Sequence, residues 1–180
     1  PLVSKGYEDP YTTFETNIMG TVNVLEATRK LRSLKGIIIA SSDKAYGKLK
    51  NNGSYKENSP LRGEHPYDVS KSCEDLIAIA YFKTYGLPIV VTRFGNVYGE
   101  GDLHFDRIIP GICEAVIENK TFKIRSNGKY IRDYLYVKDV VNGYLLLLAN
   151  LNRIKGEAFN FSSKDNLSVL EVIRIAEKSM

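Results

Sequence analysis

Tyrosine is followed by lysine four residues later at three places in the sequence, a spacing that puts both side chains on one face of a helix. The ammonium can then lower the pKa of the phenol and make it a usable base near neutral pH. Tyr67 and Lys71 stand out because Pro66 can open a helix and an apolar helical pattern follows. An exposed helical pair without a chemical role is the alternative for these two residues. The other pairs are Tyr46/Lys50, beside a glycine, and Tyr134/Lys138, in a strand-like alternation.

A hydroxyl, a carboxylate and an ammonium follow the apolar run at residues 36–40, as Ser42, Asp43 and Lys44. Such a run is typical of a strand buried in a parallel sheet, and ligands bind beyond the carboxyl ends of these strands. Ser42 and the helix-opening Tyr67 are therefore expected on the same rim. A hydroxyl that bonds the same substrate oxygen as a phenolic base suits alcohol oxidation by hydride transfer. The alternatives are a backbone cap for Ser42 and a solvated loop pair for Asp43 and Lys44.

The elements that must position these residues alternate in the first half of the chain. The apolar periodicity predicts a helix over residues 12–31, a strand over 37–40, a helix over 69–81 that Gly86 ends, and a strand over 89–92. This order of helix, strand, helix and strand predicts a doubly wound parallel α/β sheet.

The pattern changes after Gly95 and predicts a second, smaller lobe, with a ligand cleft between the two lobes. Helices are expected over residues 110–119, over 140–149 with Asp139 as the cap, and over 169–178 with Ser168 as the cap and Glu171 at the capping-box position. Short strands are expected over residues 122–125, 131–137 and 159–161.

The composition argues against a nucleic-acid-binding or membrane protein. The 180 residues include 25 basic and 21 acidic ones, for a net charge of +4, and contain no long basic cluster. No apolar run approaches the ~20 residues of a membrane-spanning helix, and no signal peptide is visible. Cys73 and Cys113 lack the companions of a disulfide or metal site. We therefore expect a cytoplasmic protein without a bound metal.

Five ordered motifs resemble those of the extended short-chain dehydrogenase/reductase family of sugar-nucleotide epimerases and dehydratases. They are N-x-x-G-T-x-N from Asn17, the serine at Ser42, Y-x-x-x-K from Tyr67, R-F-G-N-V-Y-G from Arg93 and R-D-Y-L-Y-V-K-D from Arg132. The resemblance extends over essentially all of the chain. It implies a Rossmann-type NAD-binding domain, a smaller substrate-binding lobe, a nucleoside-diphosphate sugar as substrate, and a homodimer in the full-length form.

Within this family, the two residues after the shared serine or threonine separate dehydratases from epimerases. Most dehydratases carry Asp-Glu there, whereas S-D-K and the loop at residues 99–110 resemble the CDP-glucose 4,6-dehydratase branch. By this resemblance, Asp43 protonates the departing C6 hydroxyl and Lys44 removes the C5 proton. Tyr67 takes the proton of the C4 hydroxyl while Ser42 orients that oxygen. The implied product is a 4-keto-6-deoxy sugar, formed without net oxidation.

The resemblance also implies residues for the two ligands, and both sets stand as expectations. NAD is expected to bind Ser41, Tyr67, Lys71 and Asn17, with Lys71 on the nicotinamide ribose. The sugar nucleotide is expected to bind Asn96, Arg107 and Arg132, because an arginine fork suits a diphosphate. A turn asparagine and solvated arginines are the alternatives for this second set.

The family's phosphate-binding G-x-x-G-x-x-G motif is absent from the 180 residues, as is the acidic residue that reads the adenosine ribose. We therefore expect an internal fragment that binds NAD poorly by itself. Residues 1–104 are expected to form part of the NAD-binding domain and residues 105–180 part of the substrate lobe, interleaved at the boundary. The open alternatives are a sugar-nucleotide 4-epimerase or reductase, in which Asp43 and Lys44 are bystanders, and a non-catalytic binding module.

Overall fold

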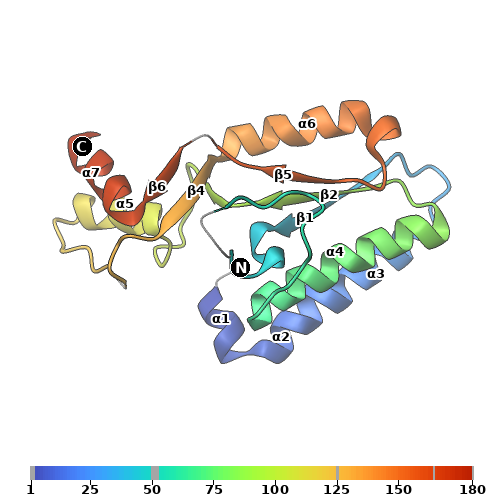
Figure 1. The fold of residues 1–180 in the computed structure, drawn as a ribbon, viewed down its shortest axis with the longest axis horizontal. Helices are drawn as coiled ribbons and strands as arrows, with labels where there is room; N and C mark the ends of the chain where they lie inside the picture. The colour runs from blue at the N-terminus through green and yellow to red at the C-terminus, as the bar shows by residue number, and fades with distance from the viewer. Residues whose placement is uncertain (1–2, 50–52, 125, 164, 180) are drawn as a thin grey trace. The chain divides into compact units, whose positions relative to one another are not determined.

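The computed structural model of the chain describes residues 3–49, 53–124, 126–163 and 165–179 (Figure 1). These residues form two compact units. The first comprises Pro1–Phe94 and Val141–Phe161, and the second comprises Gly95–Val140 and Ser162–Met180. None of the helices in the described ranges is both long enough and apolar enough to span a membrane. The assignment of residues 1–104 to cofactor and of residues 105–180 to substrate stays a prediction.

The first unit is built on a parallel sheet with the strand order β1–β2–β5. Its strands are β1 (Ile37–Ser42), β2 (Ile89–Phe94) and β5 (Ala158–Phe161). Ser42 is the register partner of Phe94, so β1 and β2 end at the same level. Every residue of β2 is buried, which accounts for the apolar run at residues 89–91. The parallel α/β sheet predicted from the sequence is confirmed.

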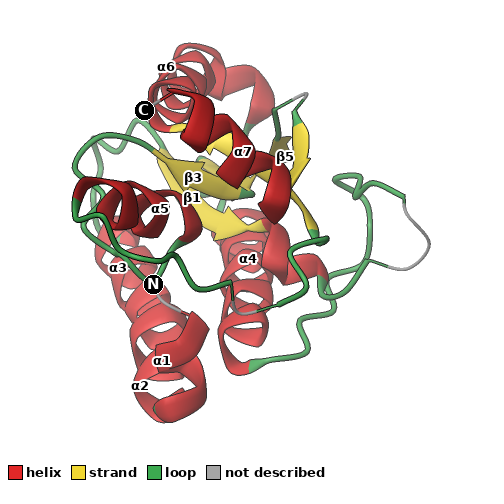
Figure 2. Ribbon diagram, turned by 90° about the vertical axis from the view of Figure 1, so that its left-hand side faces the viewer, coloured by secondary structure: helices red, strands yellow, loops and turns green. Residues whose placement is uncertain are grey.

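Helices cover both faces of this sheet. On one face lie α3 (Gly20–Arg29) and α4 (Pro66–Tyr85), and on the other lies α6 (Val137–Ile154). Figure 2 shows the same layers from the side, with α6 above the sheet and α4 beneath it. Such two-sided cover is what buries a parallel sheet.

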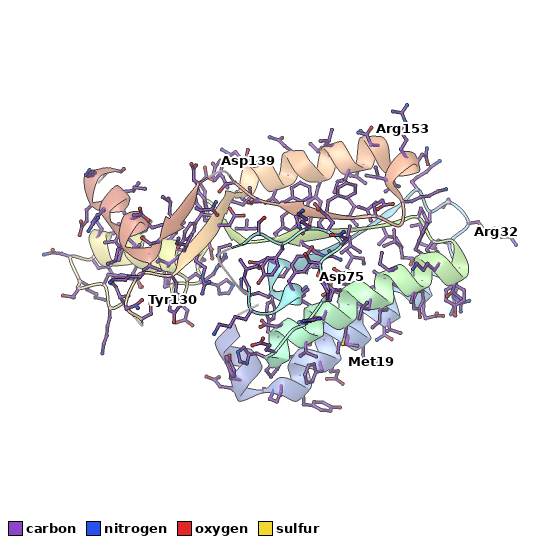
Figure 3. The ribbon with its side chains drawn as sticks, in the orientation of Figure 1. Met19, Arg32, Asp75, Tyr130, Asp139 and Arg153 are labelled. Atoms are coloured by element: carbon purple, nitrogen blue, oxygen red, sulfur yellow. The ribbon has the colours of Figure 1, made fainter. Side chains whose placement is uncertain are left out.

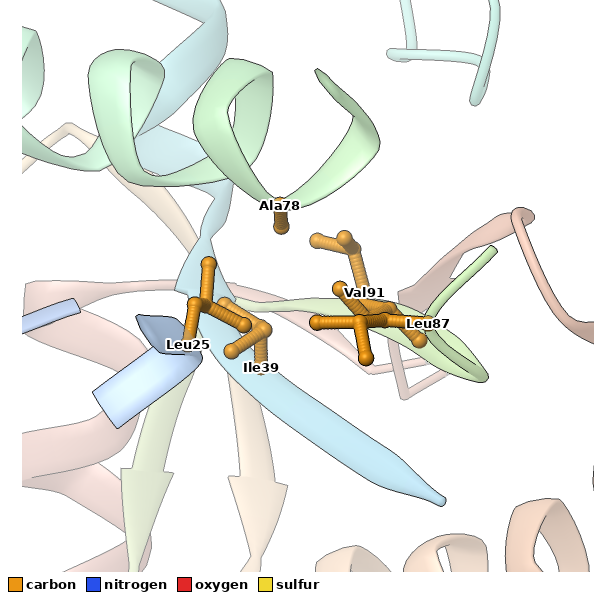
Figure 4. Close-up of a cluster of buried hydrophobic side chains, with 6 residues drawn as sticks. Leu25, Ile39, Ala78, Leu87 and Val91 are labelled. Carbon is orange, nitrogen blue, oxygen red and sulfur yellow. The ribbon is translucent and has the colours of Figure 1, made fainter. Parts of the chain in front are cut away.

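The core on the α3–α4 face holds the candidate helix against β1. Leu25 of α3 and Ala78 of α4 are fully buried against Ile39 and Val91 of the sheet (Figure 4). Full burial of one leucine side chain contributes about 1.5–3 kcal/mol. Because α4 is fixed by this core, the residues in its first turn are held close to the carboxyl end of β1.

The ends of α4 follow the signals in its sequence. Pro66 occupies the first turn, where its missing N–H leaves no hydrogen bond unmade. Gly86 ends the helix in the left-handed conformation, with φ of 69°, and its N–H donates to the Phe82 carbonyl oxygen at 2.9 Å. The predicted helix end at Gly86 is confirmed.

The segment predicted as one helix over residues 12–31 is divided in the structure. Two short helices, α1 (Val3–Glu8) and α2 (Pro10–Phe14), are followed by a π-helical turn, η1 (Glu15–Met19), and then by α3. Asp9 caps α2 by accepting a hydrogen bond from the Thr12 N–H at 3.0 Å.

The second unit contains the strands β3 (Asn96–Tyr98), β4 (Ile131–Tyr136) and β6 (Asn166–Ser168). β4 pairs with β3 in parallel and with β6 in antiparallel orientation. The helices α5 (Ile108–Ile117) and α7 (Val169–Ser179) pack against each other in this unit.

Two predictions for the second unit are wrong and one is confirmed. Residues 122–124 form no strand, and Arg125 lies outside the described residues. Asp139 lies inside the first turn of α6 and is not its cap, because the helix begins at Val137. The capping box of α7 is confirmed: the Ser168 N–H donates to Glu171 Oε2 at 2.7 Å and the Glu171 N–H donates to Ser168 Oγ at 3.3 Å.

Candidate active site

The carboxyl end of β1 leads directly into a 3-10 turn, η2 (Asp43–Tyr46). Ser42, at the junction, is 8% exposed. Its Oγ accepts a hydrogen bond from the Lys44 N–H at 3.2 Å and donates to Asp43 Oδ1 at 3.1 Å. Ser42 therefore caps the turn, as one sequence alternative held, and the cap fixes its hydroxyl at the rim of the sheet.

Tyr67, in the first turn of α4, lies near enough to Ser42 for the serine hydroxyl to favour the ionised phenol. Burial raises the pKa of the Tyr67 phenol to about 12, and the Ser42 hydroxyl opposes this rise. The carboxylates of Glu74, Asp43 and Asp68 raise the same pKa further. The fold thus brings together a hydroxyl from the end of β1 and a phenol from the start of α4.

The ammonium of Lys71 has two acceptors close to the end of β1. Its Nζ donates to Glu74 Oε2 at 2.7 Å and to the Ala40 carbonyl oxygen at 2.8 Å. The side chains of Lys71 and Glu74 are only 12% and 10% exposed. The predicted low pKa of Tyr67 is wrong in direction, because burial of the phenol raises its pKa and the Glu74 carboxylate raises it further.

Asp43 and Lys44 form an ion pair with each other on the η2 turn. Lys44 Nζ donates to Asp43 Oδ2 at 2.8 Å and to Oδ1 at 3.0 Å. Their side chains are 30% and 31% exposed, so both are partly open to solvent. An acid–base pair of this kind lies directly beside the Ser42 hydroxyl.

Two residues predicted to bind the cofactor make contacts inside the first unit. Asn17 Nδ2 donates to Ser70 Oγ at 2.9 Å, and Ser41 Oγ donates to the Lys71 carbonyl oxygen at 3.4 Å. Both contacts end on α4, so Asn17 and Ser41 help to hold its first two turns. Their contact with a dinucleotide stays a prediction.

Sequence reasoning gave no role to Tyr46, Glu74 or the pair Arg93–Asp75. Tyr46 is 4% exposed, and Lys50, its partner by spacing, lies outside the described residues. Glu74 follows Lys71 by three residues, a spacing that pairs side chains on a helix, and this spacing could have indicated the Lys71–Glu74 ion pair. Arg93 stands at the head of a quoted motif, yet only the structure shows that it is buried.

Two of the residues predicted to bind the sugar nucleotide line one cavity in the second unit. Asn96 of β3 and Arg107, just before α5, border a cavity of about 120 Å³. Asn96 Nδ2 donates to the Asp133 carbonyl oxygen at 3.2 Å. Arg107 donates to Asp102 Oδ2 at 2.7 Å and also to the Val97 carbonyl oxygen. These bonds orient both side chains before any ligand binds.

Tyr134 lines the same cavity, and its hydroxyl is, within the described ranges, a buried side-chain atom without a hydrogen-bond partner. An unsatisfied buried hydroxyl costs about 1–3 kcal/mol. Arg132 lies outside this lining and is exposed, with its guanidinium 5.6 Å from the centre of the Tyr130 ring.

Known proteins resemble this chain over most of its length. The CDP-glucose 4,6-dehydratase of Salmonella typhimurium is 34% identical over 177 residues, covering 92% of this chain and 49% of that protein. The CDP-paratose 2-epimerase of Salmonella typhi is 34% identical, covering 94% of this chain and 57% of that protein. A solved dTDP-glucose 4,6-dehydratase from Streptomyces venezuelae with NAD bound superposes with a TM-score of 0.91 and 29% identity, covering 99% of this chain and 54% of that one.

The chain spans about half the length of the curated relatives that it matches. The superposition confirms the prediction of a Rossmann-type sheet. Residues 2–162 match the sequence profile of one family, described as the NAD dependent epimerase/dehydratase family. The resemblance read from the five motifs is therefore confirmed, and the chain belongs to the NAD dependent epimerase/dehydratase family.

Proposed function

We propose that the protein containing this chain dehydrates a nucleoside-diphosphate hexose to its 4-keto-6-deoxy sugar, with NAD as cofactor and CDP-glucose as the favoured substrate. One observation carries the proposal: the Ser42 hydroxyl, which favours ionisation of the Tyr67 phenol, lies next to the Asp43–Lys44 ion pair at one rim of the sheet. The hydroxyl and the phenol suit oxidation of an alcohol, and the ion pair supplies an acid and a base for elimination. Similarity to a CDP-glucose 4,6-dehydratase supports the choice of substrate.

The residues at the end of β1 fit the nicotinamide side of the cofactor. An ammonium has three N–H donors, and Ala40 and Glu74 accept two of those on Lys71. The third donor suits a ribose hydroxyl, next to the Tyr67 phenol. When bound, NAD supplies a group that accepts a hydride and later returns it. The relatives are about twice as long, so the remaining cofactor contacts are sought in the rest of the protein.

Oxidation at C4 is assigned to Tyr67 and Ser42. As phenolate, Tyr67 accepts the proton of the C4 hydroxyl, while the Ser42 hydroxyl donates a hydrogen bond to the C4 oxygen. Loss of that proton and of the C4 hydride leaves a carbonyl at C4. The carbonyl makes the C5–H bond acidic and prepares the elimination.

Elimination is assigned to Lys44 and Asp43 after one proton has moved between them. Transfer of a proton along their 2.8 Å contact converts ammonium and carboxylate into amine and carboxylic acid. The amine removes the C5 proton, the acid protonates the C6 hydroxyl, and water leaves. C6 then receives the hydride and C5 regains a proton, so the sugar loses water without net redox change. Exclusion of water by a bound substrate favours the uncharged pair.

Glu74→Gln is expected to move the pH dependence of C4 oxidation to lower pH by about one unit. Because the Glu74 carboxylate raises the pKa of Tyr67, its removal lowers that pKa and increases the phenolate fraction at any pH below it. The measurement uses the full-length protein and CDP-6-deoxyglucose, which lacks the C6 hydroxyl and therefore stops after oxidation. The rate of change in nicotinamide absorbance is followed across pH.

Glu26→Gln is the matched control for Glu74→Gln. Glu26 pairs with Arg29 at the same spacing of three residues, but on α3, and it is not among the groups that shift the pKa of Tyr67. Its profile is expected to coincide with that of the wild type. A Glu74→Gln profile that also coincides with the wild type would contradict this account of the Tyr67 environment.

The proposed function is tested by incubating the full-length protein with NAD and CDP-glucose, UDP-glucose or dTDP-glucose. The proposal predicts loss of water, seen by mass spectrometry, with CDP-glucose as the best substrate. Similarity to a CDP-paratose 2-epimerase favours epimerisation as the second candidate, which inverts one carbon at unchanged mass. Inversion without loss of water would therefore replace the proposal, and no reaction with any sugar would indicate a binding module.

A further inference from the structure

The η2 turn has an exposed half and a buried half. Asp43 and Lys44 are partly open to solvent, whereas Ala45 is 0% and Tyr46 is 4% exposed. The Ala45 carbonyl oxygen accepts hydrogen bonds from Ser72 Oγ at 2.8 Å and from the Arg62 N–H at 2.9 Å. The buried half therefore anchors the turn, and the exposed half carries the candidate acid and base.

The hydroxyl of Tyr46 is held from two sides. Arg93 Nη1 donates to it at 2.5 Å, and it donates to Asn160 Oδ1 of β5 at 2.7 Å. The Arg93 guanidinium also lies 4.9 Å from the centre of the Tyr46 ring. The Tyr55 ring stacks on the Tyr46 ring, with 4.6 Å between the ring centroids. Both the position of the Tyr46 ring and the direction of its hydroxyl are thus fixed.

Arg93 can act as an anchor because it is itself immobilised. Asp75 of α4 accepts from Arg93 Nε at 2.7 Å and from Nη2 at 2.9 Å, and the two side chains are 1% and 6% exposed. Figure 3 shows Asp75 on the side of α4 that faces the sheet. A bidentate pair of this kind fixes the guanidinium plane as well as its charge. Arg93 Nη1 also donates to the Glu57 carbonyl oxygen at 2.8 Å.

The residues assigned to oxidation have further anchors outside the η2 turn, in addition to the hydrogen bond that Ser42 Oγ accepts from the Lys44 N–H at 3.2 Å. Ser42 belongs to the β1–β2 ladder, where it is the register partner of Phe94. Tyr67 belongs to α4, which the core of the first unit fixes. Loosening of the Tyr46 hydroxyl therefore displaces Asp43 and Lys44 more than Ser42 and Tyr67.

Building on the proposed function, we propose that Tyr46 is a positioning residue. Its hydroxyl, held by Arg93 and Asn160, sets the placement of Asp43 and Lys44. Tyr46 therefore governs the elimination step and leaves the oxidation step unaffected. Reaction rates depend strongly on the placement of the reacting groups, and a displacement of about 1 Å can lower the rate by about 10²-fold.

The test compares the two steps in the full-length Tyr46→Phe variant, which keeps the buried ring and loses only the hydroxyl. Water loss from CDP-glucose is expected to fall about 10- to 100-fold, while oxidation of CDP-6-deoxyglucose stays at the wild-type rate. Tyr81→Phe is the matched control, because its hydroxyl donates to Glu26 at 2.8 Å, away from this network. Both of its rates are expected to stay at the wild-type level.

Asn160→Ala provides a second variant that removes the other partner of the Tyr46 hydroxyl. It is expected to slow elimination selectively. The double variant is expected to be no slower than Tyr46→Phe, since the hydroxyl that Asn160 holds is already absent from Tyr46→Phe. If both steps fall together, or if elimination is unchanged in both single variants, the inference is wrong. Should Tyr46→Phe fail to fold, Asn160→Ala decides by the same criterion. A wild-type protein that does not release water would instead refute the proposed function itself.

Discussion

The Tyr67→Phe variant is expected to lose C4 oxidation by about 10²- to 10⁴-fold, the range of a missing general base. The substitution removes the only proposed proton acceptor for the C4 hydroxyl and keeps the ring that packs at the start of α4. Because every later step needs the C4 carbonyl, water loss from CDP-glucose should fall by the same factor. Both rates are measured in the full-length protein, with CDP-6-deoxyglucose for oxidation and CDP-glucose for the complete reaction.

Tyr85→Phe is the control for this variant, since Tyr85 lies at the opposite end of the same helix and is 49% exposed. Its two rates should match those of the wild type. Turnover of Tyr67→Phe near the wild-type level would mean that another group takes the proton. The assignment of the Ser42–Tyr67 pair to oxidation would then be wrong.

The Lys44→Ala variant is expected to separate the two halves of the reaction. Elimination should fall by about 10²-fold or more, because no base remains for the C5 proton, while C4 oxidation proceeds. The nicotinamide absorbance should therefore change on addition of CDP-glucose and should not return, since the oxidised sugar cannot lose water. Stopped-flow absorbance and mass spectrometry of the product follow the two halves together.

Lys48→Ala is the control for Lys44→Ala, because Lys48 is an exposed lysine shortly after the same turn. It should leave both halves of the reaction intact. If Lys44→Ala releases water at the wild-type rate, Asp43 and Lys44 are bystanders. An epimerase or reductase function would then be favoured over the dehydratase.

The first unit was predictable because its signals are local. The apolar runs of β1 and β2 and the Pro66 and Gly86 ends of α4 fix where strands and helix lie. Parallel strands share one functional edge, so residues just beyond β1 and at the start of α4 were expected to be neighbours. The structure does place Ser42 beside Tyr67.

The electrostatics of this site depend on contacts that sequence spacing does not show. A Tyr–Lys pair one turn apart suggests a lowered phenol pKa. Burial of Tyr67 and the Glu74 carboxylate, which binds Lys71, instead raise that pKa. The Tyr46 hydroxyl meets residues 47 and 114 positions away, so its anchoring role could not be read from its neighbours in the chain. Phe122 and Ile124 carried a strand signal, yet residues 122–124 form no strand.

The fate of deuterium placed at C4 of CDP-glucose tests the central claim most directly. The full-length protein is incubated with NAD and the labelled sugar, and the product is examined by NMR and mass spectrometry. The account predicts a 4-keto-6-deoxy product that has lost water and carries the deuterium at C6, because the hydride removed from C4 is returned there. Deuterium still at C4, in a sugar of unchanged mass and inverted configuration, would contradict the account.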